Sequence, residues 1–380
     1  MNFEGVLTAT ALIMADNETS GGWLEIANGL ITRTGRGEPP TGAVQIDGII
    51  VPGFVDTHAH GAVGADFGRT DEAGARAAAA HHASRGTTTL IASVASATPT
   101  DLQHAVDTLG PLVDDGTLAG IHLEGPYLAH RRRGAHNPAH LRSPDLDELR
   151  HLIERGRGAI RSVTLAPELP GAQAAVRYLV QHGIVAAIGH TDCTTAEARD
   201  AIDWGATVAT HLFNGMPELL HRAPGPAGAA LVDPRMTLEL ILDGVHLAPE
   251  VAMLVTRAAP GRYALVSDAM EATGQPDGDY EIAGSRVRVA DGAARLADGS
   301  SLAGSTQLIG DCIARLLAID GVSLRDAVAA TSTTPRRALG LPATGLTPGA
   351  PADLVVLHGP MPDVTVSQVM RRGKWLSSSS

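Results

Sequence analysis

Short apolar runs alternate with helical patterns along most of this chain. Eight of the runs are rich in aliphatic and β-branched residues, as expected of strands buried on both faces of a parallel sheet. Most of the segments between them have helical periodicity and end at a glycine, a common signal for a helix C-terminus. The repeated order of strand and helix predicts an α/β fold, a (β/α)8 TIM barrel. The predicted strands cover 49–54, 87–93, 118–123, 162–166, 184–189, 206–210, 237–242 and 263–267, and the clearest predicted helices cover 73–84, 145–155, 171–182 and 195–204.

Both ends of the chain have a different pattern. The first 52 residues alternate short apolar runs with the turn signals Asn28-Gly29 and Asp47-Gly48, as β-hairpins do. A helical stretch at 324–339 precedes a second segment of strand and turn. A barrel takes about 250–300 residues, which leaves this material for a second domain. We therefore predict a catalytic barrel over 53–344 and a small β-sandwich domain built from both termini, 1–52 and 345–380.

Residues of the metal-binding type follow five of the predicted strands. The first two are His58 and His60, whose side chains point the same way on an extended chain and can bind one ion. A His-x-His pair alone is also common among ordinary polar loop residues, so the other four matter. These are Glu124, His190, His211 and Asp268, at the ends of predicted strands 3, 5, 6 and 8. Their spacing matches whole numbers of βα units of roughly 30 residues. Because such barrels carry their chemistry at the strand C-termini, we predict a metal centre there.

A long loop rich in glycine and proline follows predicted strand 6, at 213–226. Loops at this end of a barrel commonly bind ligands, so we predict a binding element.

Composition removes several functional classes. The formal net charge of −12 argues against nucleic acid and against an anionic membrane surface as partners. No apolar run is long enough to cross a membrane, and the first residues lack the basic region of a signal peptide. The two cysteines, Cys193 and Cys312, are too few for a disulfide framework, so we expect a cytoplasmic protein. Lys374 is the only lysine, which excludes a Schiff base, a phosphate-loop lysine or a carboxylated lysine in the barrel.

With these residues in view, the chain resembles the N-acetylglucosamine-6-phosphate deacetylase family of the amidohydrolase superfamily. The resemblance runs from about residue 20 to the C-terminus. It is carried by the motifs at 52–61, 122–127, 134–138, 189–191, 210–216, 243–246, 267–269 and 302–305. It implies metal-dependent hydrolysis of the N-acetyl group of N-acetylglucosamine-6-phosphate to glucosamine-6-phosphate and acetate, in amino-sugar catabolism and cell-wall recycling. The superfamily often bridges its metals with a carboxylated lysine, whereas this family uses a glutamate on strand 3.

The resemblance also implies a ligand set for one or two divalent ions. His58, His60 and Asp268 would bind one ion, His190 and His211 the other, and Glu124 could bridge them. Family members without His-x-His hold one metal and those with it hold two, so both sites can form here. Zinc is the expected ion, with iron or another divalent ion as the alternative.

Two residues are predicted to act on the scissile amide. Asp268 would take the proton of the metal-bound water and return it to the leaving amine; the alternative is a plain ligand or a helix N-cap. By resemblance, His136 would hydrogen-bond the substrate carbonyl; the alternative is an exposed loop histidine.

The resemblance gives further residues to the phosphosugar. His246 and Arg222 would bind the phosphate, with Arg222 completing the neighbouring site of a homodimer. The backbone N–H groups of Asn214 and Gly215 would add donors, and this chain has glycine at 215 where the family commonly has alanine. The predicted substrate-binding set is Ala135, His136, Asn214, Gly215, Arg222, His246, Leu302, Ala303 and Gly304.

Several other side chains are assigned plainer roles. The run 131–133 is either a phosphate trap or a solvated arginine loop, and we favour the loop. His81 and His82 are expected on the surface of an outer helix, and Cys193 as a small packed thiol. His122 is given no catalytic role although it lies close to Glu124 in sequence.

Three alternative functions remain open. The nearest is an N-acetylgalactosamine-6-phosphate deacetylase, and the second is an N-acyl-amino-acid hydrolase, which would not need Arg222 and His246 as an anion clamp. The third is a non-catalytic amidohydrolase-like scaffold that acts through assembly. Such scaffolds typically lose metal ligands, and all six candidates are present here.

Overall fold

The structure is a computed structural model that describes residues 2–14, 18–343 and 345–376. The chain divides into two compact units. The first contains Met1–Asp56, Ala80–Thr89 and Leu308–Ser380, and the second contains Thr57–Ala79 and Leu90–Gln307. The domain limits expected near residues 52 and 344 stay a prediction. The parts of the predicted domains at 1, 15–17, 344 and 377–380 lie outside the described residues.

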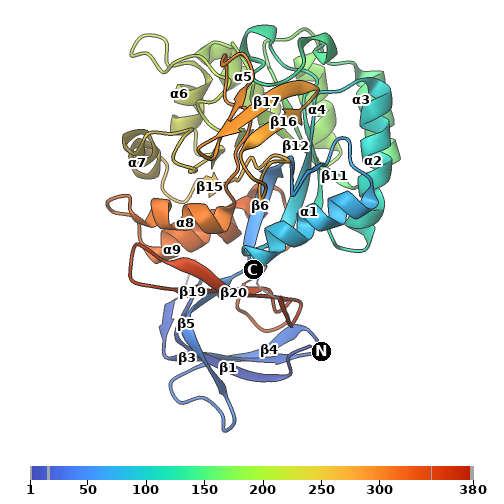
Figure 1. The fold of residues 1–380 in the computed structure, drawn as a ribbon. Helices are drawn as coiled ribbons and strands as arrows, with labels where there is room; N and C mark the ends of the chain where they lie inside the picture. Colours follow the sequence, from blue (N-terminus) through green and yellow to red (C-terminus); the bar gives the residue numbers. More distant parts are fainter. Residues whose placement is uncertain (1, 15–17, 344, 377–380) are drawn as a thin grey trace. The chain divides into compact units, whose positions relative to one another are not determined.

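Eight strands form one sheet, and seven of them match predicted barrel strands; Figure 1 draws its first strand, β6, in blue. Each strand pairs with the next one along the chain, and the neighbours from β9 to β15 are parallel. Asp268 N donates to His58 O (2.9 Å) and His60 N donates to Ala269 O (2.7 Å), so the end of the last strand meets the first. The predicted (β/α)8 barrel is therefore confirmed. Its strands are β6 (Phe54–Ala59), β9 (Thr87–Ala95), β10 (Gly120–Glu124), β11 (Ile160–Leu165), β12 (Val185–Ile188), β13 (Val208–Ala209), β14 (Thr237–Leu240) and β15 (Tyr263–Leu265).

Helices follow the barrel strands, and local signals explain where they begin and end. Thr194 and Glu197 form a reciprocal capping box at the start of α5, and Asp145 caps α3 through two backbone N–H groups. The predicted stop at Gly156 is shifted, since Gly156 is the last helical residue and Arg157 takes the left-handed conformation at φ 44°. The helices are α1 (Glu72–Ser84), α2 (Pro99–Asp114), α3 (Leu146–Gly156), α4 (Ala172–Gln181), α5 (Thr195–Trp204), α6 (Gly225–Val232), α7 (Pro249–Ala258), α8 (Ile309–Leu317), α9 (Leu324–Val328) and α10 (Thr334–Ala338), with short 3₁₀ turns at His130–Arg132 and Pro138–His140 and a π-helical turn at Ala329–Thr333.

The first barrel strand differs from the prediction. The apolar run at 49–54 is divided, because β5 (Val44–Pro52) belongs to the sheet of the termini and β6 begins at Phe54. Two apolar strands thus follow each other with one residue between them. Periodicity alone does not reveal such a break.

Small antiparallel elements that the sequence analysis did not predict accompany the barrel. β16 (Gly278–Ile282), β17 (Ser285–Ala290) and β18 (Ala293–Leu296) form a meander after β15, and β7 (Gly61–Ala62) pairs with β8 (Ala65–Asp66). The turns of the meander are Ala283-Gly284 and Asp291-Gly292, all four with positive φ. These two dipeptides are turn signals, and the alternation of polar and apolar residues at 285–290 is typical of a strand between them.

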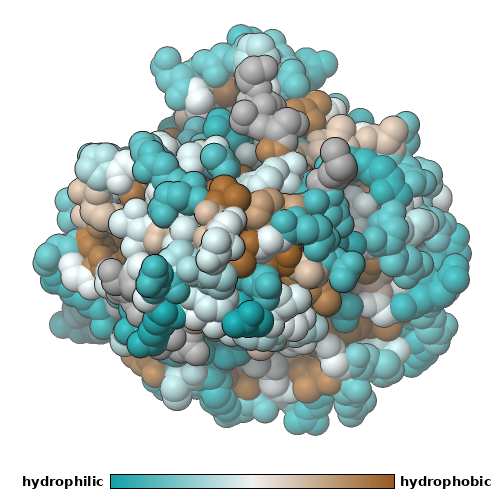
Figure 2. Space-filling view, turned by 90° about the horizontal axis from the view of Figure 1, so that it is seen from below, coloured by the Kyte–Doolittle hydropathy of each residue, from teal (hydrophilic) through white to brown (hydrophobic). Residues whose placement is uncertain are grey.

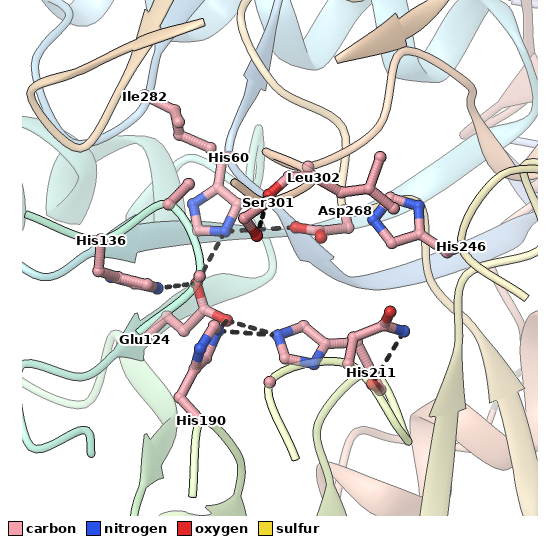
Figure 3. Close-up of a pocket in the computed structure, with 15 residues that line it drawn as sticks. His60, Glu124, His136, His190, His211, His246, Asp268, Ile282, Ser301 and Leu302 are labelled. Carbon is pink, nitrogen blue, oxygen red and sulfur yellow. Dashed lines mark hydrogen bonds and ion pairs between the residues drawn. The ribbon is translucent and has the colours of Figure 1, made fainter. Parts of the chain in front are cut away.

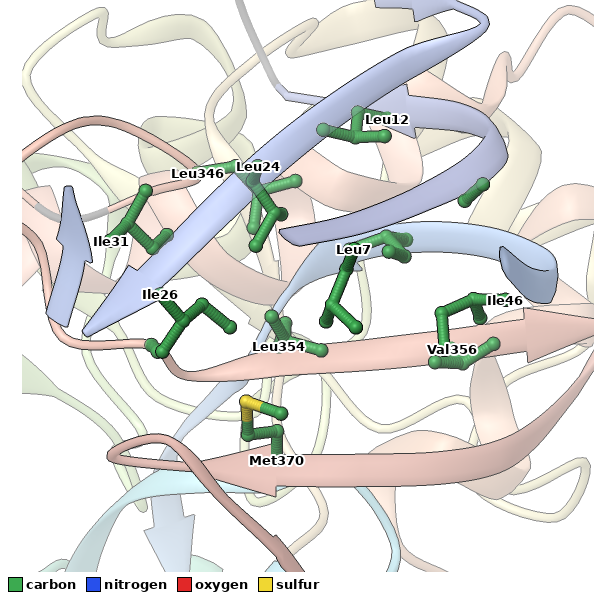
Figure 4. Packing of buried hydrophobic residues seen from close by; sticks show 13 residues of the cluster. Leu7, Leu12, Leu24, Ile26, Ile31, Ile46, Leu346, Leu354, Val356 and Met370 are labelled. Carbon is green, nitrogen blue, oxygen red and sulfur yellow. The ribbon is translucent and has the colours of Figure 1, made fainter. Parts of the chain in front are cut away.

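Strands from both termini form the second eight-stranded sheet, in the order β21-β20-β19-β5-β1-β3-β4 with β2 beside β1. Leu354 pairs with Pro52, which joins the C-terminal strands to the N-terminal ones. Aliphatic side chains from both segments point toward one another in Figure 4, and Leu7, Leu24 and Met370 are fully buried there. The remaining strands are β1 (Gly5–Ile13), β2 (Glu18–Ser20), β3 (Gly22–Ala27), β4 (Leu30–Arg36), β19 (Leu354–His358), β20 (Thr365–Arg371) and β21 (Lys374–Leu376).

The two turn signals at the N-terminus have different outcomes. Asn28 and Gly29 have φ values of 53° and 74° and join β3 to β4, as predicted. The turn expected at Asp47-Gly48 is wrong, because both residues lie inside β5. Gly48 has φ 140°, and a Cβ there would lie 2.5 Å from Leu357 O, so the neighbouring strand explains this glycine.

His82 also departs from the prediction. Its side chain is fully buried, with Nδ1 3.8 Å from Asp56 Oδ2, and His81 is half-buried. The expectation of a surface residue is therefore wrong for His82. Alanine-rich helix α1 has little sequence contrast between its two faces, which explains the error.

The face in Figure 2 is mostly hydrophilic, with small separate apolar areas between the polar side chains. Scattered apolar side chains are ordinary on protein surfaces and support no argument. Within the described part of the chain, no helix is both long and apolar enough to cross a membrane.

Candidate active site

All six candidate ligands lie at the C-terminal end of the barrel strands. His58 lies within β6 and Glu124 is the last residue of β10, while the other four follow their strands. Three of these, His190, His211 and Asp268, have positive φ values of 46°, 28° and 48°. Non-glycine residues adopt this conformation at a cost, and such strain gathers at functional sites. The strained backbone conformation therefore occurs at three of the six candidate ligands.

The first ligand group is His58, His60 and Asp268. The Nε2 atoms of the two histidines are 3.1 Å apart, and each lies 3.5 Å from Asp268 Oδ1. All three residues are buried. Strands from the two ends of the barrel sequence thus supply one compact set of donor atoms.

The second group is Glu124, His190 and His211. Glu124 Oε1 lies 3.1 Å from His190 Nε2 and 3.0 Å from His211 Nε2, and the two nitrogens are 3.1 Å apart. The other carboxylate oxygen, Oε2, lies 3.1 Å from His60 Nε2. Figure 3 shows Glu124 between the histidines of both groups. Glu124 is therefore the residue that touches both sets of ligands.

The donor set fits a bound cation. His190 Nδ1 lies 2.7 Å from the carbonyl oxygen of Arg132, which only accepts, so Nδ1 carries the ring proton. His190 Nε2 then faces a carboxylate oxygen of Glu124, a contact that needs positive charge between the two atoms, either a bound cation or a second ring proton. Ligand atoms about 2.1 Å from one ion lie roughly 3–3.5 Å from each other, which matches these separations. The chain therefore contains metal-binding groups, and their residues fit divalent ions.

The electrostatics of the cluster favour positive charge. Burial lowers the pKa of His58, but the carboxylates of Glu124, Glu239 and Asp268 outweigh it and hold that pKa well above its usual value. Burial raises the pKa of Glu124, yet the surrounding histidines hold it well below its ordinary range. Glu124 is thus a buried carboxylate that stays ionised and attracts cations.

His136 is buried beside Glu124, not exposed on its loop. The backbone N–H of Ser96 donates to His136 Nδ1 (3.2 Å), and Nε2 lies 3.1 Å from Glu124 Oε2. Burial is the main cause that lowers the pKa of His136 to about 4. The ring is therefore neutral near pH 7, with its proton on Nε2, and this N–H faces Glu124 Oε2 at the wall of the cavity.

A cavity of about 180 Å³ opens onto the ligands. His246 lines it, and its Nδ1 is 2.7 Å from Asp243 Oδ2. Burial raises the pKa of Asp243, but hydrogen bonds from the side chain and backbone of His246 bring it below its ordinary value. His246 is thus held by an ionised carboxylate. The predicted substrate-binding residues that line the cavity are Ala135, His136, Asn214, Gly215, His246, Leu302 and Gly304.

Two predicted substrate-binding residues lie elsewhere. Ala303 is fully buried in the apolar cluster around Met270 and Ile282. Arg222 is exposed and does not line the cavity.

The predicted backbone donors lie in the loop after β13. The N–H of Asn214 donates to His211 O at 2.9 Å, so it is already used within the loop. A Cβ on Gly215 would lie 2.8 Å from His190 Nδ1, which explains why glycine suits this position.

The arginine run does more than face solvent. Arg131 is exposed, but Arg132 is half-buried, and both pair with Asp192, at 3.1 Å and 2.8 Å. Asp192 N donates to Glu168 Oε1 (2.6 Å), which holds the loop after His190. The expectation of a plain solvated loop is therefore wrong for Arg132.

Several residues around the site were missed or left without a role. Glu239 on β14 is buried, accepts from Thr57 Oγ1 at 2.8 Å and lies 3.5 Å from His58 Nδ1. A charged residue inside an apolar strand was the signal that pointed to it. His122 is buried between Ser93 Oγ (2.9 Å) and Thr164 Oγ1 (2.8 Å), and its ring makes a T-shaped contact with the ring of His58.

Cys193 is a buried, free thiol packed with Ala198 and Ala229, as expected. Burial raises the pKa of Cys193 to about 12, so the thiol stays protonated near pH 7. A protonated thiol is a poor metal ligand, which agrees with its packing role.

Comparison with known proteins places this geometry in a family. Residues 49–376 match the Amidohydrolase family. The N-acetylgalactosamine-6-phosphate deacetylase of Escherichia coli O157:H7 is 35% identical over 372 residues, which cover 94% of this chain and 97% of that protein.

Two solved structures of the same Mycobacterium smegmatis enzyme are also similar. The crystal structure of its N-acetyl-D-glucosamine-6-phosphate deacetylase has a TM-score of 0.95 and 44% identity, over 98% of this chain and all of that one (100%). A mutant of that enzyme in complex with N-acetyl-D-glucosamine-6-phosphate has a TM-score of 0.94 and 43% identity, over 98% and 99% of the two chains. These matches span nearly the whole chain, and the chain therefore belongs to the amidohydrolase family.

Proposed function

We propose that this chain hydrolyses the N-acetyl group of N-acetylglucosamine-6-phosphate, releasing glucosamine-6-phosphate and acetate in amino-sugar catabolism and cell-wall recycling. The observation that carries the proposal is one cavity lined by residues of both ligand groups, Asp268 among them, and by His136. The 44% identity with the Mycobacterium smegmatis deacetylase supports the choice of substrate. The presence of all six ligands argues against a non-catalytic scaffold.

Asp268 is the proposed general acid and base. The two ligand groups would hold a divalent ion, whose chemistry would be to lower the pKa of water toward about 7 and to polarise the amide carbonyl. Asp268 Oδ1, 3.5 Å from both His58 Nε2 and His60 Nε2, is close enough to the ligand atoms to accept the water's proton. The same carboxylic acid then gives that proton to the amine nitrogen as it leaves.

His136 is proposed to bind the acetyl carbonyl oxygen. Its neutral ring has one N–H, on Nε2, because Nδ1 accepts from the backbone of Ser96. A donor aimed at the oxygen stabilises the negative charge that develops there during attack.

His246 and Arg222 are proposed to bind the phosphate. His246 is oriented by Asp243 through Nδ1, which leaves Nε2 for the ligand. Arg222 is exposed near Leu219 and Leu220, whose exposed fractions are 40% and 56%. An exposed arginine beside exposed leucines fits a surface that meets a second copy. We propose a homodimer in which Arg222 completes the neighbouring site.

The ion and the compartment are part of the same proposal. Zinc suits mixed histidine and carboxylate ligands, and iron or another divalent ion is the alternative. Both cysteines are free and buried, which suits a reducing cytoplasm.

A second substrate has its own support. The Escherichia coli O157:H7 relative named for N-acetylgalactosamine-6-phosphate matches 94% of this chain. The two sugars differ only in the configuration at one hydroxyl group. The galacto epimer is therefore the second candidate substrate.

The direct test measures acetate release from both 6-phosphates and from unphosphorylated N-acetylglucosamine. We expect the gluco 6-phosphate to be the best substrate. Two charge-assisted contacts of roughly 1.5–3 kcal/mol each predict a loss of about a hundred-fold or more in kcat/KM without the phosphate. A faster galacto epimer would move the assignment to the second candidate. Equal rates with and without phosphate would refute the phosphosugar assignment and favour an N-acyl-amino-acid hydrolase.

A further inference from the structure

Glu239 is a buried carboxylate behind the candidate metal site. It lies on β14, is 6% exposed, and does not line the cavity where substrate would bind. Its Oε1 accepts from Thr57 Oγ1 at 2.8 Å, and its Oε2 lies 3.5 Å from His58 Nδ1. The carboxylate therefore faces the side of His58 that is turned away from the other ligands.

A buried carboxylate needs a donor or a positive charge beside each of its oxygens. Thr57 provides the donor for Oε1, which leaves Oε2 in need of a partner. Within the described residues, the ion pair found for Glu239 is with His58. The other ring nitrogen, His58 Nε2, lies 3.4 Å from Glu124 Oε1 and 3.5 Å from Asp268 Oδ1. The ring thus has a carboxylate at each of its two nitrogens.

A divalent ion at Nε2 resolves this arrangement. The ring proton then resides on Nδ1 and points to Glu239, while the Nε2 lone pair points to the ion. Histidine ligands commonly donate their other N–H to a carboxylate, which sets the tautomer and makes the ligand more basic.

We propose that Glu239 is a positioning residue that orients His58 and keeps the His58, His60 and Asp268 group loaded with its own divalent ion. This inference rests on the metal-binding part of the proposed function and deepens it. It assigns this chain two ions. The two groups then differ in what holds a histidine from behind. In the first group the partner of His58 Nδ1 is a carboxylate, and in the second group the partner of His190 Nδ1 is the neutral carbonyl of Arg132.

The test is metal binding by the purified protein without any sugar. Wild type and Glu239→Gln are stripped of metal, titrated with zinc in the presence of a competing chelator, and analysed for ions per chain. We expect Glu239→Gln to bind one ion like wild type and the other about 10–100-fold more weakly. Its cobalt-loaded form should have a visible spectrum with one band changed.

Two further variants serve as controls. Glu271→Gln makes the same change at a half-buried carboxylate outside the ligand set, and we expect it to bind both ions as wild type does. Thr57→Val keeps Glu239 but removes its hydroxyl donor, and we expect a smaller loss confined to the same ion. Thr57→Val decides the question if Glu239→Gln does not fold.

A purely structural role predicts a different pattern. It would lower the melting temperature of the metal-free protein and weaken both ions together. That pattern, or two ions bound with wild-type affinity in both Glu239→Gln and Thr57→Val, would overturn the proposal. Because no sugar is present, loss of one ion in Glu239→Gln would stand even if deacetylation were disproved.

Discussion

The mouth of the barrel and the core of the terminal sheet both contain buried side chains, but of opposite kinds. At the mouth, His58, Glu124 and His211 are at most 4% exposed. In the sheet, Leu24, Ile50 and Leu354 are fully buried. Apolar burial stabilises a fold, whereas buried polar groups cost stability unless something compensates them. The difference teaches that the mouth is built for a ligand and the sheet for stability.

The largest expected effect comes from removing a ligand at the mouth. His211→Ala should reduce deacetylation by roughly 10⁴-fold or more, since the activation of water and of the carbonyl both depend on the ion. The metal-free melting temperature should change by only a few degrees. Acetate release and calorimetry measure the two effects. His182→Ala, an exposed histidine at the end of α4, is the control. Normal turnover in His211→Ala would sink the metal-dependent mechanism.

The second prediction separates chemistry from binding at the mouth. Asp268→Asn keeps the shape but cannot accept a proton, so kcat should fall by about 10²–10⁴-fold. KM should stay nearly unchanged, because the phosphate-binding residues are untouched. Steady-state kinetics and metal analysis on one preparation decide the case. If activity is lost only together with the ion, Asp268 is a ligand and the base lies elsewhere.

The third prediction tests the sheet by the opposite criterion. Leu24→Ala should cost about 2–5 kcal/mol of the free energy of unfolding, because it leaves a cavity in a fully buried cluster. The kcat of the folded fraction should match wild type. Urea unfolding and kinetics on the same sample measure both. Leu30→Ala makes the same change at a side chain that is 43% exposed, and it should cost far less. Equal losses at both positions would contradict the assignment of the core.

The smallest expected effect is a pH dependence in the unit that contains the terminal sheet. Burial raises the pKa of Asp353 above 3.8, although the N–H of Arg372 donates to it at 2.6 Å. A raised pKa in the folded state means that this group's contribution to stability is full below pH 3.8. This contribution to stability is lost as the pH rises through the pKa that Asp353 has in the folded protein. Asp353→Asn should therefore match wild type in melting temperature at low pH and exceed it by a few degrees at pH 7. A larger gain in melting temperature at low pH than at pH 7 would contradict a raised pKa of Asp353.

Local patterns were sufficient to predict most of the barrel and to place the candidate ligands at its strand ends. Each of the six ligand residues ends or follows an apolar run, and a parallel barrel brings all such ends to one face. The capping box at Thr194 is also local, because Glu197 provides both partners. The turn at Asn28-Gly29 was predicted from its own two residues, although Asn28 N donates to Glu4 and Ala352 N donates to Gly29 O. The meander at 278–296 had comparable turn signals that were overlooked.

Other features depend on residues far away in the sequence. His82 looks like a surface residue in its alanine-rich helix, but Asp56 lies 3.8 Å from it in the fold. The turn expected at Asp47-Gly48 gave way to β5, which pairs with both β1 and β19. Pairing with distant strands overrides a weak local turn signal.

The sequence by itself determined seven of the eight barrel strands and which side chains stand at the strand ends, because periodicity and spacing are properties of neighbouring residues. Only the tertiary structure decided that Glu124 touches both ligand groups and that Glu239, 182 residues from Thr57, lies behind His58. It also decided the left-handed backbone of His190, His211 and Asp268. These features arise where strands from distant parts of the chain close into a barrel, and packing between them sets distances that no local pattern contains.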